Sequence, residues 1–291
     1  HHHLFADDMQ GLASGFLSSV PVIASTLSSC FTDVGTWCAS KRLQLNASKT
    51  EVMWVGTANG LRKLPAGSGC IYAGSEIVKP VSVVRNLGVW IDAELTMRDQ
   101  VSKTCQSCFF HLRRLRSIRK LLGRDVTIQL VCALVLSRLD YCNSVYAGLP
   151  AATLAPLQRV LHAAARLVND LKTSDHVTSA LMDLHWLPIK QRVEYKLCCH
   201  VHNVSIGHAP VYISDMLTAC ADVPSLCRLR TSSSGNYVIP RTWLKLGERA
   251  FAVSAPLAWN NLPHDLKITK CTVTFKRLLK TFLFKSAYFK N

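Results

Sequence analysis

Apolar and polar residues alternate in short stretches over the first part of the chain, which is typical of strands and turns. Residues 4–17 are apolar on both sides of Asp7 and Asp8, and this pattern predicts a β-hairpin with the two carboxylates at its tip. Residues 21–43 begin at a proline and carry apolar side chains three or four positions apart, so they predict a helix.

Two further strand regions are expected in the same part of the chain. Residues 52–55 are an apolar run after a turn, which predicts a buried strand, and residues 82–92 are rich in β-forming side chains. From residue 96 to about 168 the apolar positions recur at helical spacing and predict two or three helices, with breaks near Gly123 and Pro150. The prolines of the remaining chain indicate short helices joined by turns.

The order of these elements predicts an α+β fold in which a small α/β portion is followed by a helical portion. We expect boundaries that divide the chain into residues 1–95, 96–170 and 171–291. A chain of 291 residues is long enough for two compact units, each with its own core.

The charge of the chain indicates what kind of partner it binds. Lys and Arg outnumber Asp and Glu, which gives a formal net charge of +16 and an isoelectric point near 9.5. Such an excess favours an acidic partner, with nucleic acid ahead of a membrane surface. No uninterrupted apolar stretch reaches the roughly 20 residues that a membrane-spanning helix needs, so we expect no membrane insertion.

Twelve cysteines lie at scattered spacings, and no basic segment with an apolar leader precedes them. This distribution argues against a secreted disulfide scaffold and favours reduced thiols in an intracellular protein of the cytoplasm and nucleus. Cys105, Cys108 and His111 have a metal-like spacing, but structural zinc needs four ligands and no second pair follows at a recognised distance. We expect buried thiols there instead of a zinc site.

The paired aspartates are the first candidate for chemistry. Neighbouring residues of a strand point to opposite faces, so Asp7 is favoured for direct metal ligation and Asp8 for support beside the site. Mg²⁺ prefers hard oxygen ligands, and phosphoryl-transfer sites combine carboxylates from separate strands with substrate phosphates. By itself an Asp-Asp turn is common, and a solvated turn without metal is the alternative.

The residues around this pair resemble a known family. The segment "HLFADDMQ" is similar to the metal-binding hairpin of the reverse transcriptases of non-LTR retrotransposons, in the form carried by chicken-repeat and jockey-type elements. "LQLNASKTEVMWVG" and "VRNLGVWID" then resemble the next palm block and the strand block that grips the primer end. Later blocks, among them "LDYCNSVYAGLP", "LHWLPIKQRVEYK" and "APLAWNNLP", resemble the carboxy-terminal region of the same elements.

This resemblance implies RNA-directed DNA synthesis, with an RNA template, a DNA primer and deoxynucleotides as partners. Asp7 and Asp8 would hold two Mg²⁺ ions that activate the primer 3′ hydroxyl and stabilise the leaving pyrophosphate, and a relic hairpin without metal is the alternative. Lys49 resembles the palm lysine that protonates or stabilises pyrophosphate. A solvated lysine at the start of a strand is the alternative for that residue.

Three more residues are implied to contact nucleotide or primer. Phe5 would pack beside the incoming nucleotide, with a core phenylalanine as the alternative. Leu87 and Gly88 would belong to the primer grip, where a glycine allows close approach of the backbone, and an ordinary buried strand is the alternative for Leu87. In the family, the fingers and an aspartate that ligates both metals precede His1, so we expect this chain alone to lack polymerase activity.

A dense run of basic residues follows in the helical portion. The segment "RRLRSIRKLLGR" contains no acid and carries six cations: Arg113, Arg114, Arg116, Arg119, Lys120 and Arg124. Together with an apolar line through Leu112 and Leu115, they predict a helix whose cationic face tracks the phosphates of an RNA/DNA hybrid. A solvated face is one alternative, and binding to a membrane or an acidic protein is another. The non-enzymatic alternative for the whole chain is a relic or domesticated module that only binds nucleic acid.

Overall fold

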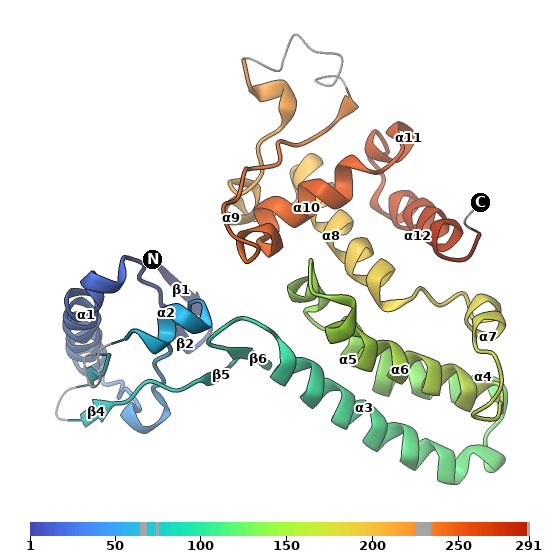
Figure 1. The fold of residues 1–291 in the computed structure, drawn as a ribbon, viewed down its shortest axis with the longest axis horizontal. Coiled ribbons are helices and arrows are strands. Elements are labelled where there is room, and N and C mark those ends of the chain that lie inside the picture. The colour runs from blue at the N-terminus through green and yellow to red at the C-terminus, as the bar shows by residue number, and fades with distance from the viewer. Residues whose placement is uncertain (65–68, 74–75, 225–233, 290–291) are drawn as a thin grey trace. The chain divides into compact units, whose positions relative to one another are not determined.

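The computed structural model describes residues 1–64, 69–73, 76–224 and 234–289 of the chain (Figure 1). The chain forms two compact units, His1–Asp99 and Gln100–Asn291. The first unit contains eight Lys and Arg residues against eight Asp and Glu residues, so the whole formal net charge of +16 lies in the second unit. Long-range attraction for polyanions therefore belongs to the second unit.

Three β-hairpins and one long helix form most of the described part of the first unit (Figure 1). The hairpins pair β1 (His2–Phe5) with β2 (Asp8–Gly11), β3 (Ile71–Ala73) with β4 (Glu76–Val78), and β5 (Val83–Asn86) with β6 (Val89–Asp92), all antiparallel. Helix α1 (Val20–Ser40) has Pro21 in its first turn, where the missing N–H costs no hydrogen bond. A short helix, α2 (Ala58–Arg62), follows. The hairpin predicted around Asp7 and Asp8 is confirmed, although its second strand ends at Gly11, and the helix predicted at 21–43 is confirmed as α1. The strand region predicted at 82–92 forms two strands, β5 and β6.

The buried strand predicted at residues 52–55 is wrong. Only Val52 makes a strand-like contact, an isolated parallel bridge with Pro80, in which the Val81 amide donates to the Val52 carbonyl at 2.9 Å. The Trp54 indole donates from Nε1 to the Gly69 carbonyl at 3.0 Å. The segment is therefore a loop that is held by the Val52 carbonyl and the Trp54 indole.

The second unit is mainly helical. Its first elements are α3 (Arg98–Ile118), which starts just before the unit boundary, α4 (Arg124–Val131), a π-helical turn (Cys132–Leu136), α5 (Ser137–Asp140) and α6 (Ala151–Val168). Gly123 and Pro150 are the residues immediately before α4 and α6. The two predicted helix breaks are therefore confirmed.

The remaining helices are α7 (Thr178–Asp183), α8 (Ile189–Ser205), α9 (Val211–Ser214), α10 (Phe251–Asn260), α11 (His264–Lys267) and α12 (Thr272–Tyr288). The sequence pattern predicts only short helices here, but α8 and α12 contain 17 residues each. Their length follows from apolar side chains that are buried four residues apart, such as Leu197 and Val201 in α8 and Phe275 and Leu279 in α12.

Helix α8 packs against both α10 and α12, and this contact forms part of the core of the second unit (Figure 1). Trp259 is 1% exposed and donates from Nε1 to the Gly235 carbonyl at 2.8 Å. The Phe275 ring stacks on His202 with the ring centroids 4.0 Å apart. The fold class is α+β and mainly helical, as predicted in general terms. Among the described residues, no helix combines the length and the apolar character that crossing a membrane requires.

Candidate functional site

The two candidate carboxylates lie at the turn of the β1–β2 hairpin. Phe5 and Asp8 are its last paired residues, so Ala6 and Asp7 form a two-residue turn. Ala6 has a φ of 52°, a left-handed conformation that costs a residue with a Cβ about 1–2 kcal/mol. The chain therefore accepts backbone strain directly beside the carboxylates.

The whole hairpin is open to solvent in this unit. Asp7 and Asp8 are exposed, and Phe5 is 58% exposed, so the alternative of a core phenylalanine is wrong. Leu4 and Met9, which pair across the opposite face of the ribbon, are exposed as well. A two-stranded ribbon is marginally stable by itself, and apolar side chains on both faces are typical of a surface that another element covers.

A hydrogen bond joins this hairpin to the β5–β6 hairpin. The Gln10 side chain donates from Nε2 to Asn86 Oδ1 at 2.6 Å. Gln10 lies two residues after Asp8 on β2, and therefore on the same face of the ribbon, while Asn86 directly precedes the turn at Leu87 and Gly88. The fold thus brings the candidate carboxylates and the candidate primer-contact turn into one part of the first unit.

Leu87 and Gly88 both have positive φ, 44° and 81°, which is the combination found in type I′ hairpin turns. Glycine adopts this conformation at no steric cost, whereas leucine is strained in it. Gly88 is exposed, and Leu87 is half-buried in the turn between the strands, so the alternative of an ordinary buried strand is wrong for Leu87.

Lys49 is exposed and ends a 3₁₀ turn (Ala47–Lys49), so its predicted place at the start of a strand is wrong. Its backbone N–H donates to the Asn46 carbonyl at 3.1 Å, and the Ser48 hydroxyl donates to Asn46 Oδ1 at 2.6 Å. Asn46 therefore shapes this turn. Within the described residues, no hydrogen bond or ion pair joins the Lys49 side chain to Asp7 or Asp8.

The oxygen chemistry of the β1–β2 turn suits Mg²⁺, but the turn supplies only two carboxylates. In the part of the chain that the structure describes, no group of three or more His, Cys, Asp or Glu side chains converges as a metal site. An ion held by Asp7 and Asp8 would complete its coordination with water, substrate phosphate or a further carboxylate. The donors fit the ion in kind and are too few for a complete site.

The exposed side of α3 carries three of the predicted cations. Arg113, Arg114 and Arg116 are exposed, whereas Leu112 and Leu115 are buried, which confirms the amphipathic pattern. The Arg114 guanidinium lies 5.6 Å from the centroid of the Phe110 ring, a distance typical of cation–π contacts. None of the three arginines has an acidic partner among the described residues.

Arg119 has a different environment. Its guanidinium donates from Nε and Nη2 to the last two carbonyls of α6, those of Leu167 and Val168, at 3.0 and 2.9 Å. Nη1 donates to the Leu122 carbonyl at 2.8 Å. The carbonyls at a helix C-terminus carry partial negative charge, so Arg119 caps α6 and its hydrogen-bonding capacity is largely used by the fold.

Lys120 and Arg124 are exposed at the end of the same basic run. Arg124 donates from Nε and Nη2 to Asn169 Oδ1, at 3.2 Å in both cases, and this neutral partner leaves its charge uncompensated. The cations that remain open to a ligand define what we call the α3 basic face: Arg113, Arg114 and Arg116 on α3, Lys120 in the 3₁₀ turn that follows it, and Arg124 at the start of α4.

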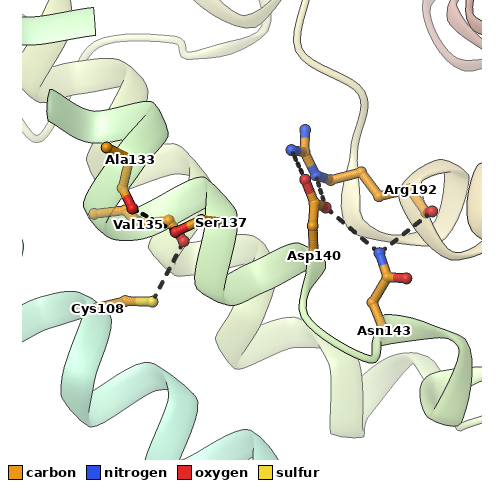
Figure 2. A network of polar contacts seen from close by, with 7 residues as sticks. All are labelled: Cys108, Ala133, Val135, Ser137, Asp140, Asn143 and Arg192. Carbon is orange, nitrogen blue, oxygen red and sulfur yellow. Dashed lines mark hydrogen bonds and ion pairs between the residues drawn. The ribbon is translucent and has the colours of Figure 1, made fainter. Parts of the chain in front are cut away.

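Cys105 and Cys108 lie on the buried side of α3. Burial raises the pKa of the Cys105 thiol to about 11 and that of the Cys108 thiol to about 12. Cys108 Sγ donates to the Val135 carbonyl at 3.8 Å (Figure 2). Both side chains are therefore protonated at neutral pH and pack as core residues. The eleven cysteines that the structure describes all have free thiols.

A polar network in the second unit has no counterpart among the predicted site residues. Asp140, the last residue of α5, accepts from Arg192 Nε and Nη2 at 2.8 and 2.7 Å (Figure 2). Asn143 donates from Nδ2 to Asp140 Oδ1 and to the Arg192 carbonyl, both at 3.4 Å. The ion-paired residues are 52 positions apart, and no spacing within either segment indicates that they meet.

Comparisons with models of known protein families, with curated proteins and with solved structures found no match to this chain. Its function is therefore inferred from its own residues and geometry.

Proposed function

We propose that this chain is the carboxy-terminal part of the reverse transcriptase of a non-LTR retrotransposon. The first unit would be the rear of the polymerase palm, and the second would contain a thumb that binds nucleic acid. The observation that carries the proposal is the Gln10–Asn86 hydrogen bond, which links the carboxylate hairpin to the turn at Leu87 and Gly88. In a polymerase, metal ligands and primer contacts have to converge on the primer 3′ end.

The open surface of the β1–β2 hairpin supports the palm assignment. Phe5, Leu4 and Met9 are exposed on a ribbon of two strands, which buries too little apolar surface to be stable alone. Further palm strands and helices of the intact enzyme would cover these side chains. The strained turn would then hold the carboxylates at the surface that faces the primer and the incoming nucleotide.

Mg²⁺ bound at Asp7 and Asp8 would supply charge stabilisation for nucleotidyl transfer. Because these two carboxylates do not complete a metal site, we expect no primer extension by this chain alone. The test is a primer-extension assay on an RNA template with Mg²⁺. Extension that depends on Asp7, and so disappears in Asp7→Ala, would contradict this expectation.

The α3 basic face supports binding to the phosphates of an RNA/DNA hybrid. It carries five exposed cations without acidic partners among the described residues. Each phosphate contact changes the slope of log K against log salt concentration by about −0.9, so three to five contacts predict a slope between about −2.7 and about −4.5. Such contacts recognise the backbone and not the sequence.

A nucleic-acid-binding module without catalysis is the second candidate function. The observation that favours it is that the whole net charge belongs to the second unit, whereas the candidate carboxylates belong to the first. If it is correct, variants of the β1–β2 hairpin and of the Leu87 turn leave hybrid binding unchanged at every salt concentration.

Fluorescence anisotropy with a labelled RNA/DNA hybrid tests the binding that both candidate functions require. We expect Arg113→Glu/Arg114→Glu/Arg116→Glu to weaken binding by about 100-fold or more at low salt, because contacts become repulsions. The matched control is Lys270→Glu/Arg277→Glu/Lys285→Glu, which makes the same charge change at exposed positions of the same unit. An equal loss in both variants would show that net charge, and not the α3 basic face, drives binding.

A further inference from the structure

A cleft of about 350 Å³ opens beside the Asp140–Arg192 pair in the second unit. Its walls come from the π-helical turn, from α5, from the segment before α8, and from α8 and α12. Leu136, Trp186, Leu187 and the ring of Tyr195 supply apolar and aromatic surface. The volume falls in the range of small-molecule pockets, about 300–1,000 Å³.

The charged groups at this cleft are mostly cationic. Arg192, Lys196 and Lys280 line it together with one carboxylate, the partner of Arg192. Three cations against one carboxylate leave a local formal charge of +2. Lys196 and Lys280 have no acidic partner among the described residues, and Glu194, the acid nearest in sequence on α8, pairs with Lys190 at 3.9 Å. The cleft therefore favours an anion with about two negative charges, such as a phosphate monoester.

Electrostatic effects on Cys132 indicate that these charges share one space. Burial raises the pKa of the Cys132 thiol, Arg192 and Lys280 lower it, and Asp140 raises it. The three charged groups come from three different helices, α8, α12 and α5. The Cys132 side chain on the wall of the cleft thus interacts electrostatically with charged groups from all three helices.

Arg192 is held ready for a ligand. Asp140 fixes two of its nitrogens, its side chain is 14% exposed, and Nη1 has no partner among the described residues (Figure 2). A guanidinium with a fixed plane suits the oxygens of a phosphate. Asn143 also lines the cleft and is 2% exposed, and its Oδ1 has no hydrogen-bond partner in the described structure. This buried acceptor would be satisfied by a hydroxyl of the ligand or by a water molecule.

Two irregular stretches of backbone border the cleft. The π-helical turn Cys132–Leu136 interrupts α4 and α5, and His185 at the cleft has a φ of 51°. Both features occur preferentially at functional sites. The Tyr288 hydroxyl donates to the Trp186 carbonyl at 2.7 Å and so ties the end of α12 to the segment that carries His185.

We propose that this cleft binds the phosphate group of a nucleotide. Arg192, Lys196 and Lys280 contact the phosphate, and the wall at Leu136 and Leu187 contacts the rest of the ligand. The nucleotide is either free or the 5′ end of a nucleic-acid strand, because both present the same phosphate chemistry. The site includes no residue of the β1–β2 hairpin or of the α3 basic face, so it is independent of the proposed polymerase function.

Titration calorimetry on the full chain with pairs of probes tests the proposal. The first pair is adenosine 5′-monophosphate and adenosine, and the second is a short oligonucleotide with a 5′ phosphate and its 5′-hydroxyl form. We expect at least one phosphorylated probe to bind with a Kd of about 1 mM or below, and its partner to bind at least tenfold more weakly. The pair that shows the difference identifies the source of the phosphate. The oligonucleotide pair is measured with the triple glutamate variant of α3, so that strands bound there do not obscure the result.

Lys196→Ala/Lys280→Ala should reduce the affinity for the phosphorylated probe at least tenfold. Arg277→Ala/Lys285→Ala removes the same charge from exposed positions of α12 outside the cleft and should change it less than twofold. In the unaltered protein, a saturating probe should also slow the alkylation of Cys132 severalfold, a readout that does not depend on how the variants fold. Phosphorylated and unphosphorylated probes that bind equally, or not at all, would overturn the proposal, as would equal affinities of the two double variants.

Discussion

Replacement of Arg119 by alanine should destabilise the second unit without weakening its direct contacts with nucleic acid. Arg119 belongs by sequence to the basic run of α3, but three of its nitrogens donate to carbonyls, two of them at the C-terminus of α6. Alanine removes all three donors and takes one cation away from the C-terminus of α6. The expected effect is therefore on the free energy of unfolding.

The size of this effect follows from the three hydrogen bonds. A hydrogen bond from a charged donor contributes about 1.5–3 kcal/mol when its loss leaves a buried group unpaired, and less when water replaces the donor. Arg119 is only partly buried, so we assign about 1 kcal/mol to each bond and roughly 3 kcal/mol to the set. For a unit of about 190 residues, this loss lowers Tm by roughly 6–12 °C.

Thermal unfolding followed by circular dichroism measures this shift, and hybrid binding is measured on the same samples below the transition. Arg116→Ala is the matched control, because Arg116 is exposed near the end of α3, three residues before Arg119, and has no acidic partner among the described residues. We expect Arg116→Ala to lower affinity with a Tm change below about 2 °C, and Arg119→Ala to do the reverse. A Tm unchanged in Arg119→Ala, with affinity lost, would refute the assignment of Arg119 as a helix cap.

Three other predictions concern the core of the second unit. Trp259→Ala should lower the free energy of unfolding in urea by about 3–5 kcal/mol, because Trp259 is 1% exposed. The control Trp243→Ala should change it by less than about 0.5 kcal/mol, because Trp243 is 100% exposed. Burial lowers the pKa of His202 below 6.5, so as the pH falls the unfolded chain takes up this proton before the folded chain does, and the free energy of unfolding should decrease below about pH 6.5. His202→Asn should reduce the difference between the urea midpoints at pH 7.5 and pH 5, and an unchanged difference would exclude His202 as its cause. Iodoacetamide at pH 8.5 should alkylate the exposed Cys30 and leave Cys108 unmodified in the native protein, because Cys108 is buried and burial raises its pKa to about 12. If mass spectrometry finds both thiols modified at equal rates, the buried position of Cys108 is contradicted.

The sequence predicts the parts of the fold that local patterning determines. The apolar residues on both sides of Asp7 and Asp8 are sufficient to predict the first hairpin, and the β-forming residues at 82–92 are sufficient to predict a strand region, because in both places each strand pairs with its immediate neighbour in the chain. The prediction of a strand at 52–55 is wrong because an apolar run does not indicate which segment of the chain it will contact. Val52 and Trp54 contact Pro80 and Gly69, and nothing in their own segment indicates these contacts.

The candidate sites show the same limit more sharply. Helical spacing correctly predicts that Arg113 and Arg116 are exposed, but it cannot separate them from Arg119, whose partners lie 48 and 49 positions further along the chain. The Asp140–Arg192 pair cannot be predicted from the sequence for the same reason. Contacts between distant segments depend on packing, and a single sequence records no distance between them.

Photo-crosslinking of the primer 3′ end tests the palm assignment most directly. An RNA/DNA hybrid with a photoreactive base at the primer terminus is bound to the full chain at low salt, irradiated, and digested, and the crosslinked peptides are identified by mass spectrometry. We expect crosslinks to the β1–β2 hairpin around Phe5 or to the turn at Leu87 and Gly88, and we expect Gln10→Ala to reduce them because it removes the bond that joins the two. Crosslinks confined to the second unit would contradict the assignment and would identify the chain as a nucleic-acid-binding module.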